Sequence, residues 1–350
     1  MSAPSSRKAG ELVQPARDHR RVHPPRRVGG APVLDTALGR RGVVEAIASG
    51  LARPRVKLDL HDIQPLPKAF RMMVEERTFH FAEMPLNTLA MAIEHGRPLI
   101  GLPIVLNRDF HYRSIVVGAK STIRDPRDLI GRRVGVRAYS QTTGVWARGL
   151  LSDEFGVAHS DIRWVTTEGA HVSDYVDPDF VERAPAGSTL PALLASGDID
   201  AAVIMDPKLE SKVARPLFPD AFERAATAYG QTGIFPVNHV VALDTDIAEQ
   251  FPWLADELYA LFSDSKNAYR ARLSAEGPRD DADRYALDLQ NYVVKGDFNP
   301  YGLDANRASI EQLVRYARTQ GLITRELDVE RLFLPVNDIH SSLAPTKDRS

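Results

Sequence analysis

The feature that most constrains the fold is a regular alternation of short apolar segments with amphipathic helical segments. Residues 187–207, GSTLPALLASGDIDAAVIMDP, show the pattern well. Ser188 or Thr189 can cap a short helix, Pro191 suits its first turn, and Gly197 can adopt the left-handed conformation that ends it. The AAVIM run that follows is apolar without alternation, as in a strand covered on both faces. Repeated along the chain, this alternation predicts an α/β fold.

The order of the elements predicts two lobes. With 350 residues, the chain is long enough for two α/β domains. A strand at about 238–244 follows the second series of elements and leads into long amphipathic helices, so we expect the first lobe to resume there. This places lobe 1 at 31–117 plus 238–350 and lobe 2 at 118–237. Each lobe is expected to be a mixed, mainly parallel sheet flanked by helices, and the pair to close on a ligand as a hinged clamp.

Composition excludes several classes of protein and site. Residues 1–30 are rich in Arg, Pro, Ser and Gly and are predicted to be a disordered tail. The sequence has no apolar run of the kind that a secretory signal or a membrane span requires, which favours a cytoplasmic protein without a membrane partner. A net charge of −2 gives no reason to expect nucleic acid as a partner. The absence of cysteine excludes disulfides and thiolate chemistry, and no His or Glu-His pair has metal-ligand spacing on a helix, so neither metal nor cofactor is expected.

Three motifs give the sequence a family resemblance. They are FRMMVEERTFHFAEMPLNT at 70–88, Gly-Asp-Ile-Asp-Ala at 197–201 and NPYGLDANR at 299–307. In this order they resemble the 4,5-dihydroxyphthalate decarboxylase family, whose members have the type II periplasmic-binding-protein-like fold. The resemblance spans about residues 33 to 335. Family members carry an acidic residue and Arg-Thr after the first strand, whereas this chain reads TALGRRG.

The resemblance implies cofactor-independent decarboxylation of a hydroxylated aromatic dicarboxylate, of the 4,5-dihydroxyphthalate to 3,4-dihydroxybenzoate type, between the lobes. Such a substrate needs groups that bind carboxylates. Arginine offers a planar fork that matches a carboxylate, and a helix N-terminus offers free N–H groups. Solvated charges and ordinary helix capping are the alternatives for the same residues. The predicted substrate-binding residues are Arg108, Arg113, His61, Ser140, Thr142, Thr143 and Asn238.

Decarboxylation also needs a proton for the carbon that loses CO₂, and imidazole titrates near neutrality. His239 and His111 are therefore the predicted catalytic donors, with His61 as a third histidine. Glu83 and Asp206 are predicted to accept phenolic protons or to orient the imidazole. Structural hydrogen bonds and helix capping would account for the same residues without catalysis.

Two other functions fit the predicted clamp. One is a solute-binding protein for an aromatic carboxylate that performs no reaction. The other is the sensor half of a regulator, which would require a helix-turn-helix that the sequence does not offer. The expected partner is a small aromatic carboxylate, and the sequence does not decide between a monomer and a homo-oligomer.

Overall fold

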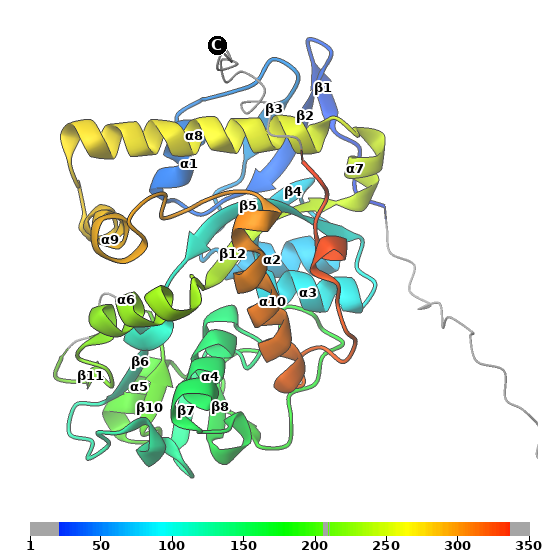
Figure 1. The fold of residues 1–350 in the computed structure, drawn as a ribbon. Coiled ribbons are helices and arrows are strands. Elements are labelled where there is room, and N and C mark those ends of the chain that lie inside the picture. Colours follow the sequence, from blue (N-terminus) through cyan, green and yellow to red (C-terminus); the bar gives the residue numbers. More distant parts are fainter. Residues whose placement is uncertain (1–20, 206–208, 210, 337–350) are drawn as a thin grey trace, which may run out of the picture.

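The protein folds into two mixed sheets flanked by helices, which confirms the predicted α/β class (Figure 1). The computed structural model describes residues 21–205, 209 and 211–336. The first sheet has the strand order β1-β2-β4-β12-β5, with β3 paired to β2. Its strands are β1 (Arg26–Val28), β2 (Ala31–Ala37), β3 (Lys57–Leu60), β4 (Phe81–Pro85), β5 (Leu99–Arg108) and β12 (Val237–Asp244).

The second sheet has the strand order β11-β6-β10-β7-β8-β9. Its strands are β6 (Ile115–Gly118), β7 (Arg133–Val136), β8 (Arg163–Thr166), β9 (Val181–Arg183), β10 (Ala201–Val203) and β11 (Ala214–Pro216). This sheet is mainly parallel, as expected, with only β6 antiparallel to its neighbours. In the first sheet antiparallel pairings outnumber parallel ones, because β12 returns from the other sheet and runs against both β4 and β5.

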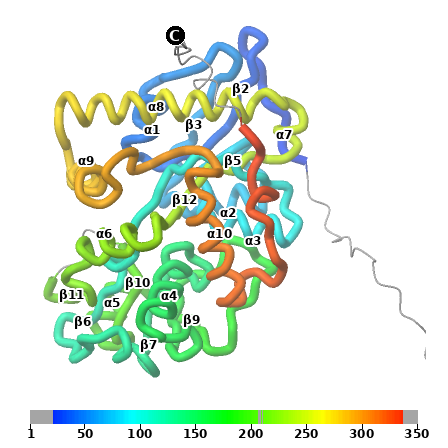
Figure 2. Tube along the Cα trace, viewed as in Figure 1, coloured from blue at the N-terminus to red at the C-terminus, as the bar shows by residue number. Residues whose placement is uncertain are grey.

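Helices cover the sheets and connect them. They are α1 (Gly42–Ala48), α2 (Pro67–Arg71), α3 (Leu86–Glu94), α4 (Thr142–Phe155), α5 (Leu190–Ser196), α6 (Ala221–Thr232), α7 (Thr245–Gln250), α8 (Leu254–Glu276), α9 (Asp281–Asp288) and α10 (Leu303–Thr319). Helix α8 packs on α1, at the end of the molecule away from the second sheet (Figure 1). Helix α10 contacts both α3 and α4, and Figure 2 shows it running from the first half of the molecule to the second. It therefore links the two sheets.

The α5–β10 unit forms as its sequence predicts. The Thr189 hydroxyl accepts a hydrogen bond from the N–H of Ala192 at 3.3 Å, and Pro191 lies in the first turn. Gly197 ends the helix with a φ of 82°, which favours glycine. Strand β10 then lies between β6 and β7 with all its residues buried. Asp206, at the end of the predicted unit, lies outside the described residues.

The boundary predicted at residue 117 falls inside a strand. Strand β6 pairs with β10 and β11, so it belongs to the second sheet. The chain therefore leaves the first sheet after Arg108 and has joined the second by Ile115. Sequence pattern alone could not place this step, since a strand looks the same whichever sheet it joins.

The prediction of a disordered tail is wrong for residues 21–30. Val22 is only 8% exposed and belongs to the main hydrophobic core, and β1 forms an antiparallel ladder with β2. The backbone carbonyl of His23 accepts a hydrogen bond from the buried His80 ring at 2.9 Å. Composition missed this because the surface that buries Val22 comes from later parts of the chain. Residues 1–20 lie outside the described residues.

We expect Val22→Ala to lower the free energy of unfolding by about 1–2 kcal/mol, because it removes buried methyl groups. Urea denaturation measures the change. Val28→Ala is the matched control: Val28 lies on the neighbouring strand β1 but is 43% exposed, and its effect should stay within about 0.5 kcal/mol. Equal effects of the two variants would contradict the packing of Val22.

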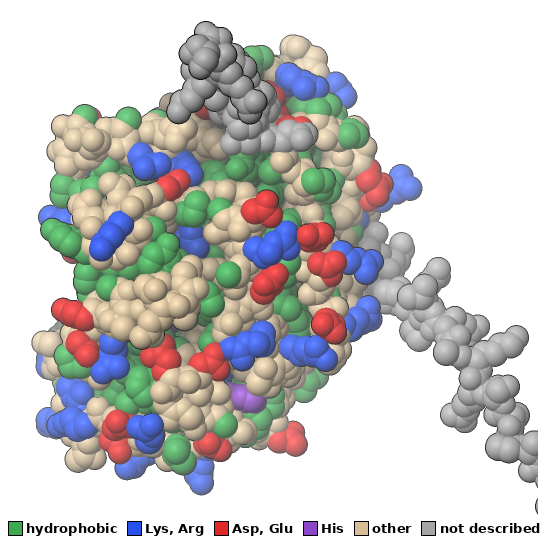
Figure 3. All heavy atoms as spheres, viewed as in Figure 1, with side chains coloured by type: hydrophobic (Ala, Val, Ile, Leu, Met, Phe, Trp, Pro, Cys, Tyr) green, Lys and Arg blue, Asp and Glu red, His purple; other side chains and the backbone are tan. Residues whose placement is uncertain are grey.

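The surface carries charges of both signs. On the face drawn in Figure 3, Lys and Arg side chains are interspersed with Asp and Glu and form no large patch of one sign. None of the helices within the described part of the chain combines the length and the apolar composition that a membrane crossing requires.

Candidate active site

The ends of parallel strands from both sheets bring the candidate site together. Strands β2 and β4 are parallel neighbours in the first sheet, and β7 and β8 are parallel neighbours in the second. Their carboxyl ends lead into the loop at residues 38–41, helix α3, helix α4 and the loop after residue 166. Open α/β sheets bind ligands outside the carboxyl ends of their strands. Each of these four segments contributes side chains to the site.

Glu83 and His239 form the centre of the site. The Glu83 side chain is fully buried on β4, and one of its oxygens lies 2.5 Å from Nδ1 of His239 on β12. The same oxygen pairs with the Arg41 guanidinium, while the second oxygen accepts the Gly39 N–H at 2.7 Å. The carboxylate thus joins two strands and the loop that follows β2. Two of the predicted catalytic residues are therefore in direct contact.

The ionisation of this pair follows from its surroundings. Burial alone would raise the pKa of Glu83, but the Arg41 charge and the hydrogen bonds from His239 and Gly39 lower it to about 2. Burial lowers the pKa of His239, and its bond to Glu83 opposes that shift only in part. An ionised carboxylate can only accept hydrogen bonds, so Nδ1 of His239 carries the proton. Nε2 of His239 has no hydrogen-bond partner among the described residues, so it remains for proton exchange with a ligand.

Gly39 lets the loop approach the carboxylate closely, because any larger residue would force the Arg41 and Glu83 side chains to shift. A Cβ atom at this position would lie 2.7 Å from a guanidinium nitrogen of Arg41 and 2.8 Å from Oε2 of Glu83. Both are closer than real Cβ contacts. The glycine therefore allows the backbone N–H to reach the buried carboxylate.

Two helix N-termini meet beside this pair. Asn87, in the first turn of α3, donates from its side chain to the Ser140 carbonyl at 2.7 Å and from its backbone N–H to the Thr142 hydroxyl at 3.3 Å. Thr142 and Thr143 begin α4 and are buried, as is Ser140. The positive ends of α3 and α4 thus lie together, an arrangement that favours an anion.

A second histidine occupies the same region. His171, in the loop after β8, lies 3.0 Å from the Thr88 hydroxyl through Nδ1. The Phe70 ring lies nearly perpendicular to both imidazoles. Its centroid is 5.5 Å from the centroid of the His171 ring and 5.3 Å from that of the His239 ring. Burial, followed by the charges of Arg137 and Arg71, lowers the pKa of His171 to about 3. His171 is therefore neutral at ordinary pH.

The remaining predicted residues make other contacts. His111 pairs with Asn238 at 2.9 Å, and burial lowers the pKa of this histidine to about 4. The Arg108 guanidinium donates a hydrogen bond to the Phe235 carbonyl at 2.6 Å and lies over the aromatic ring of the same residue. Burial lowers the pKa of Arg108 to about 9. These three residues are not joined to the Glu83–His239 pair by any hydrogen bond among the described residues.

Arg113 and His61 are bound to acidic side chains. Arg113 pairs with Asp109 at 2.7 Å, and His61 pairs with Asp35 at 2.8 Å with 41% of its side chain exposed. Asp206 lies outside the described residues. Of the predicted site residues, the structure thus brings Glu83 to His239, and Ser140, Thr142 and Thr143 to the start of α4.

Comparison with known proteins shows the family. No protein-family model matches the sequence. The chain is 31% identical over 282 residues to a 4,5-dihydroxyphthalate decarboxylase of Comamonas testosteroni, which covers 74% of this chain and 83% of that protein. The chain belongs to the 4,5-dihydroxyphthalate decarboxylase family. A second member, from Pseudomonas putida, is 32% identical over 133 residues, or 36% of this chain and 52% of that protein.

Solved structures confirm the predicted periplasmic-binding-protein-like fold. The aliphatic sulphonate binding protein SsuA from Escherichia coli aligns with a TM-score of 0.55 at 16% identity, over 87% of this chain and 92% of that protein. The desulfurization enzyme DSZB aligns with a TM-score of 0.51 at 17% identity, over 86% of this chain and 96% of that protein. The fold therefore occurs in both binding proteins and enzymes, and at these identities it is all that the likeness shows.

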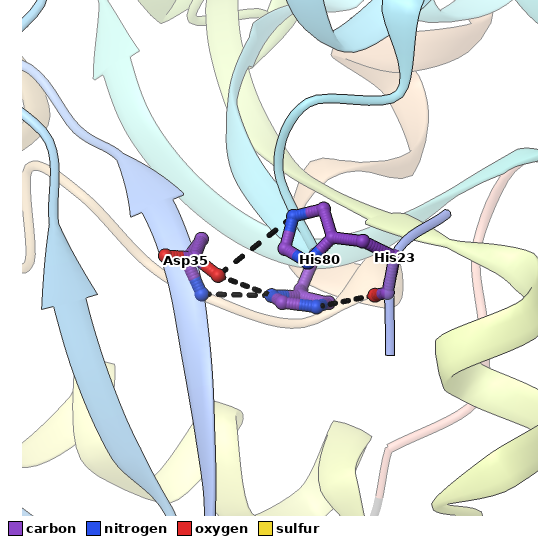
Figure 4. A group of neighbouring side chains, drawn as sticks. All are labelled: His23, Asp35 and His80. Atoms are coloured by element: carbon purple, nitrogen blue, oxygen red, sulfur yellow. Dashed lines mark hydrogen bonds and ion pairs between the residues drawn. The ribbon is translucent and has the colours of Figure 1, made fainter. Parts of the chain in front are cut away.

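In this member of the family, acidic and histidine side chains also gather away from the central pair. His23, Asp35 and His80 lie together (Figure 4), and Asp35 also adjoins Asp59 and His61. Nδ1 of His80 accepts the Asp35 N–H at 2.8 Å, and its Nε2 donates to the His23 carbonyl. Both ring nitrogens are thus engaged, and Asp59 pairs with Arg26 at 2.5 Å. Neither group fits a metal ion without breaking these contacts.

Sequence reasoning missed several residues of the site. Arg41, Arg137 and His171 each follow a parallel strand of the site within five residues, and Asn87 and Thr88 open the helix after β4. The rule that parallel strands end at a common edge, applied to every strand, would have indicated them. Only the structure shows which of these edges face one another.

Proposed function

We propose that the protein decarboxylates 4,5-dihydroxyphthalate, or a closely related hydroxylated phthalate, to the corresponding hydroxybenzoate. The observation that carries the proposal is the Glu83–His239 pair, in which a buried carboxylate fixes an imidazole and leaves Nε2 available. The names of two family relatives support this substrate. The predicted roles of His239 as proton donor and Glu83 as its orienting partner are part of the proposal.

The positive groups around the pair support binding of a dianion. The N-termini of α3 and α4 attract carboxylates without themselves reacting. A bound dianion also favours the charged imidazolium of His239, because nearby negative charge raises the pKa of histidine. Substrate binding therefore recruits the proton that the reaction consumes.

The reaction balances with this proton alone. Nε2 of His239 delivers a proton to the ring carbon that bears the leaving carboxylate, and the hydroxyl para to that carbon stabilises the resulting cation. The carbon–carbon bond then breaks, its electron pair returns to the ring, and CO₂ departs. The proton replaces the carboxylate on the ring. General acid catalysis of this kind is typical of histidine.

The two sheets provide a frame for this chemistry. We propose that residues before about 109, together with those from 237 onward, form one lobe, that 115–216 belong to the other, and that the substrate binds where the strand ends of both meet. Four of the side chains involved come from the first lobe and its helices: Arg41, Glu83, Asn87 and His239. Ser140, Thr142 and His171 come from the second.

The test is to incubate the purified protein with 4,5-dihydroxyphthalate, 4-hydroxyphthalate, phthalate and 3,4-dihydroxybenzoate and to measure CO₂ release. We expect release from the hydroxylated phthalates, with one deuterium at the vacated carbon when the reaction runs in heavy water. Phthalate lacks the para hydroxyl and should not react. Tight binding of all dicarboxylates without any CO₂ would instead establish a solute-binding protein.

A further inference from the structure

The loop at residues 167–180, between β8 and β9, is fastened to helices of the first sheet. Arg97, which is 3% exposed, donates to Asp174 at 3.0 Å and to Glu75 at 3.2 Å. Glu75 also accepts the backbone N–H of Ser173 at 2.9 Å and its hydroxyl at 3.0 Å. These contacts hold a segment that follows β8 against the turn after α3 and the helical turn after α2. We call this segment the β8–β9 loop.

The β8–β9 loop carries His171 to the region of His239. His171 is 7% exposed, and its Nδ1 is bound by Thr88. Its Nε2 has no hydrogen-bond partner among the described residues. Both imidazoles contact the Phe70 ring, and the His239 charge is one of those that lower the pKa of His171, so the two histidines lie near each other.

Two arginines, one beside each sheet, act electrostatically on His171. Arg71, at the end of α2, donates to the Ala170 carbonyl at 2.9 Å and has no carboxylate partner among the described residues. Arg137, directly after β7, pairs with Glu168 at 3.1 Å, and Glu168 is half exposed to solvent. Both charges lower the pKa of His171. A neutral imidazole near two such guanidinium groups suits an anionic ligand.

We propose that the β8–β9 loop contacts the substrate, and that His171, Arg71 and Arg137 bind the carboxylate that decarboxylation leaves in place. The inference rests on the proposed function, since that function requires a place for a second carboxylate beside the reacting one. In an ortho dicarboxylate the two groups are on adjacent carbons, so the retained carboxylate lies next to the reacting carbon. A histidine that shares Phe70 with the proton donor is placed to meet it.

The test compares His171→Gln and Arg71→Gln with wild type. We expect each variant to raise KM for 4,5-dihydroxyphthalate by about 10–100-fold, the effect of a lost charge-assisted hydrogen bond, with kcat within about threefold. Calorimetry should show the same loss of affinity for phthalate, an unreactive dicarboxylate. Affinity for catechol, which carries the ring hydroxyls but no carboxylate, should change by less than about twofold. Arg71 is exposed, so its replacement does not threaten the fold.

Matched controls keep the interpretation specific. His95→Gln, at the end of α3, and Arg284→Gln, on α9 with 61% of its side chain exposed, make the same substitutions away from the site and should leave both affinities unchanged. The proposal is overturned if both site variants keep wild-type affinity for phthalate, or if they weaken phthalate and catechol equally. Should wild type release no CO₂ while His171→Gln still selectively weakens phthalate, the proposed function fails and the loop assignment stands.

Discussion

Replacing His239 by Gln is expected to lower kcat for CO₂ release by about 10²–10⁴-fold, the usual contribution of a general acid. Glutamine retains a hydrogen-bonding group for Glu83 but cannot deliver a proton. Binding of phthalate should remain within a few-fold of wild type, because the carboxylate-binding groups are intact. The measurement is steady-state kinetics beside calorimetry with phthalate. His95→Gln is the control, and a His239→Gln variant with wild-type kcat would contradict the assignment.

Glu83→Gln provides a second readout of the same unit. It preserves size but removes the charge that holds Arg41 and His239, so kcat should fall as well. Because the two residues act together, the double variant should lose much less than the product of the single effects. In wild type, kcat/KM should decline as pH rises, because the imidazolium form of His239 is the proton donor. The decline should begin below pH 6.5, because burial lowers the pKa of His239 in the free enzyme. His239→Gln should abolish that limb of the profile.

Arg77→Met is expected to lower the free energy of unfolding by about 3–5 kcal/mol. Arg77 donates to both oxygens of Asp244, at 2.8 and 2.6 Å, and neither side chain is more than 7% exposed. Its removal leaves the Asp244 charge buried without its cation at the end of β12. The Arg77 charge also reaches Asp246 at 2.8 Å. Urea denaturation followed by far-ultraviolet circular dichroism measures the change.

The control for Arg77 is a surface ion pair in the same sheet. Arg26 and Asp59 also form a salt bridge, at 2.5 Å, but their side chains are 61% and 42% exposed. Arg26→Met should therefore cost no more than about 1 kcal/mol. If Arg77→Met and Arg26→Met lowered the free energy of unfolding to the same small extent, the prediction would be wrong. The buried charge of Asp244 would then be neutralised by another group once Arg77 is removed.

Local signals in the sequence predicted the local structure. The α5–β10 unit follows from Thr189, Pro191 and Gly197, each of which acts through the backbone within a few residues. The alternation of helices and strands predicted the α/β class, because helices that alternate with strands bury their apolar faces against a shared sheet. The chemistry of an imidazole and a carboxylate named Glu83 and His239 as candidates. That chemistry did not predict that the two residues touch.

The tertiary structure decided what the sequence left open. Glu83 and His239 are 156 positions apart and meet because β12 returns to pair with β4. Val22 is buried by surfaces formed later in the chain, so its polar neighbours in sequence misled the prediction. Arg108 fits the sequence pattern of an anion-binding residue, yet its guanidinium binds a backbone carbonyl. Caps and turns depend on neighbours along the chain, whereas ionisation, burial and the composition of a site depend on neighbours in space.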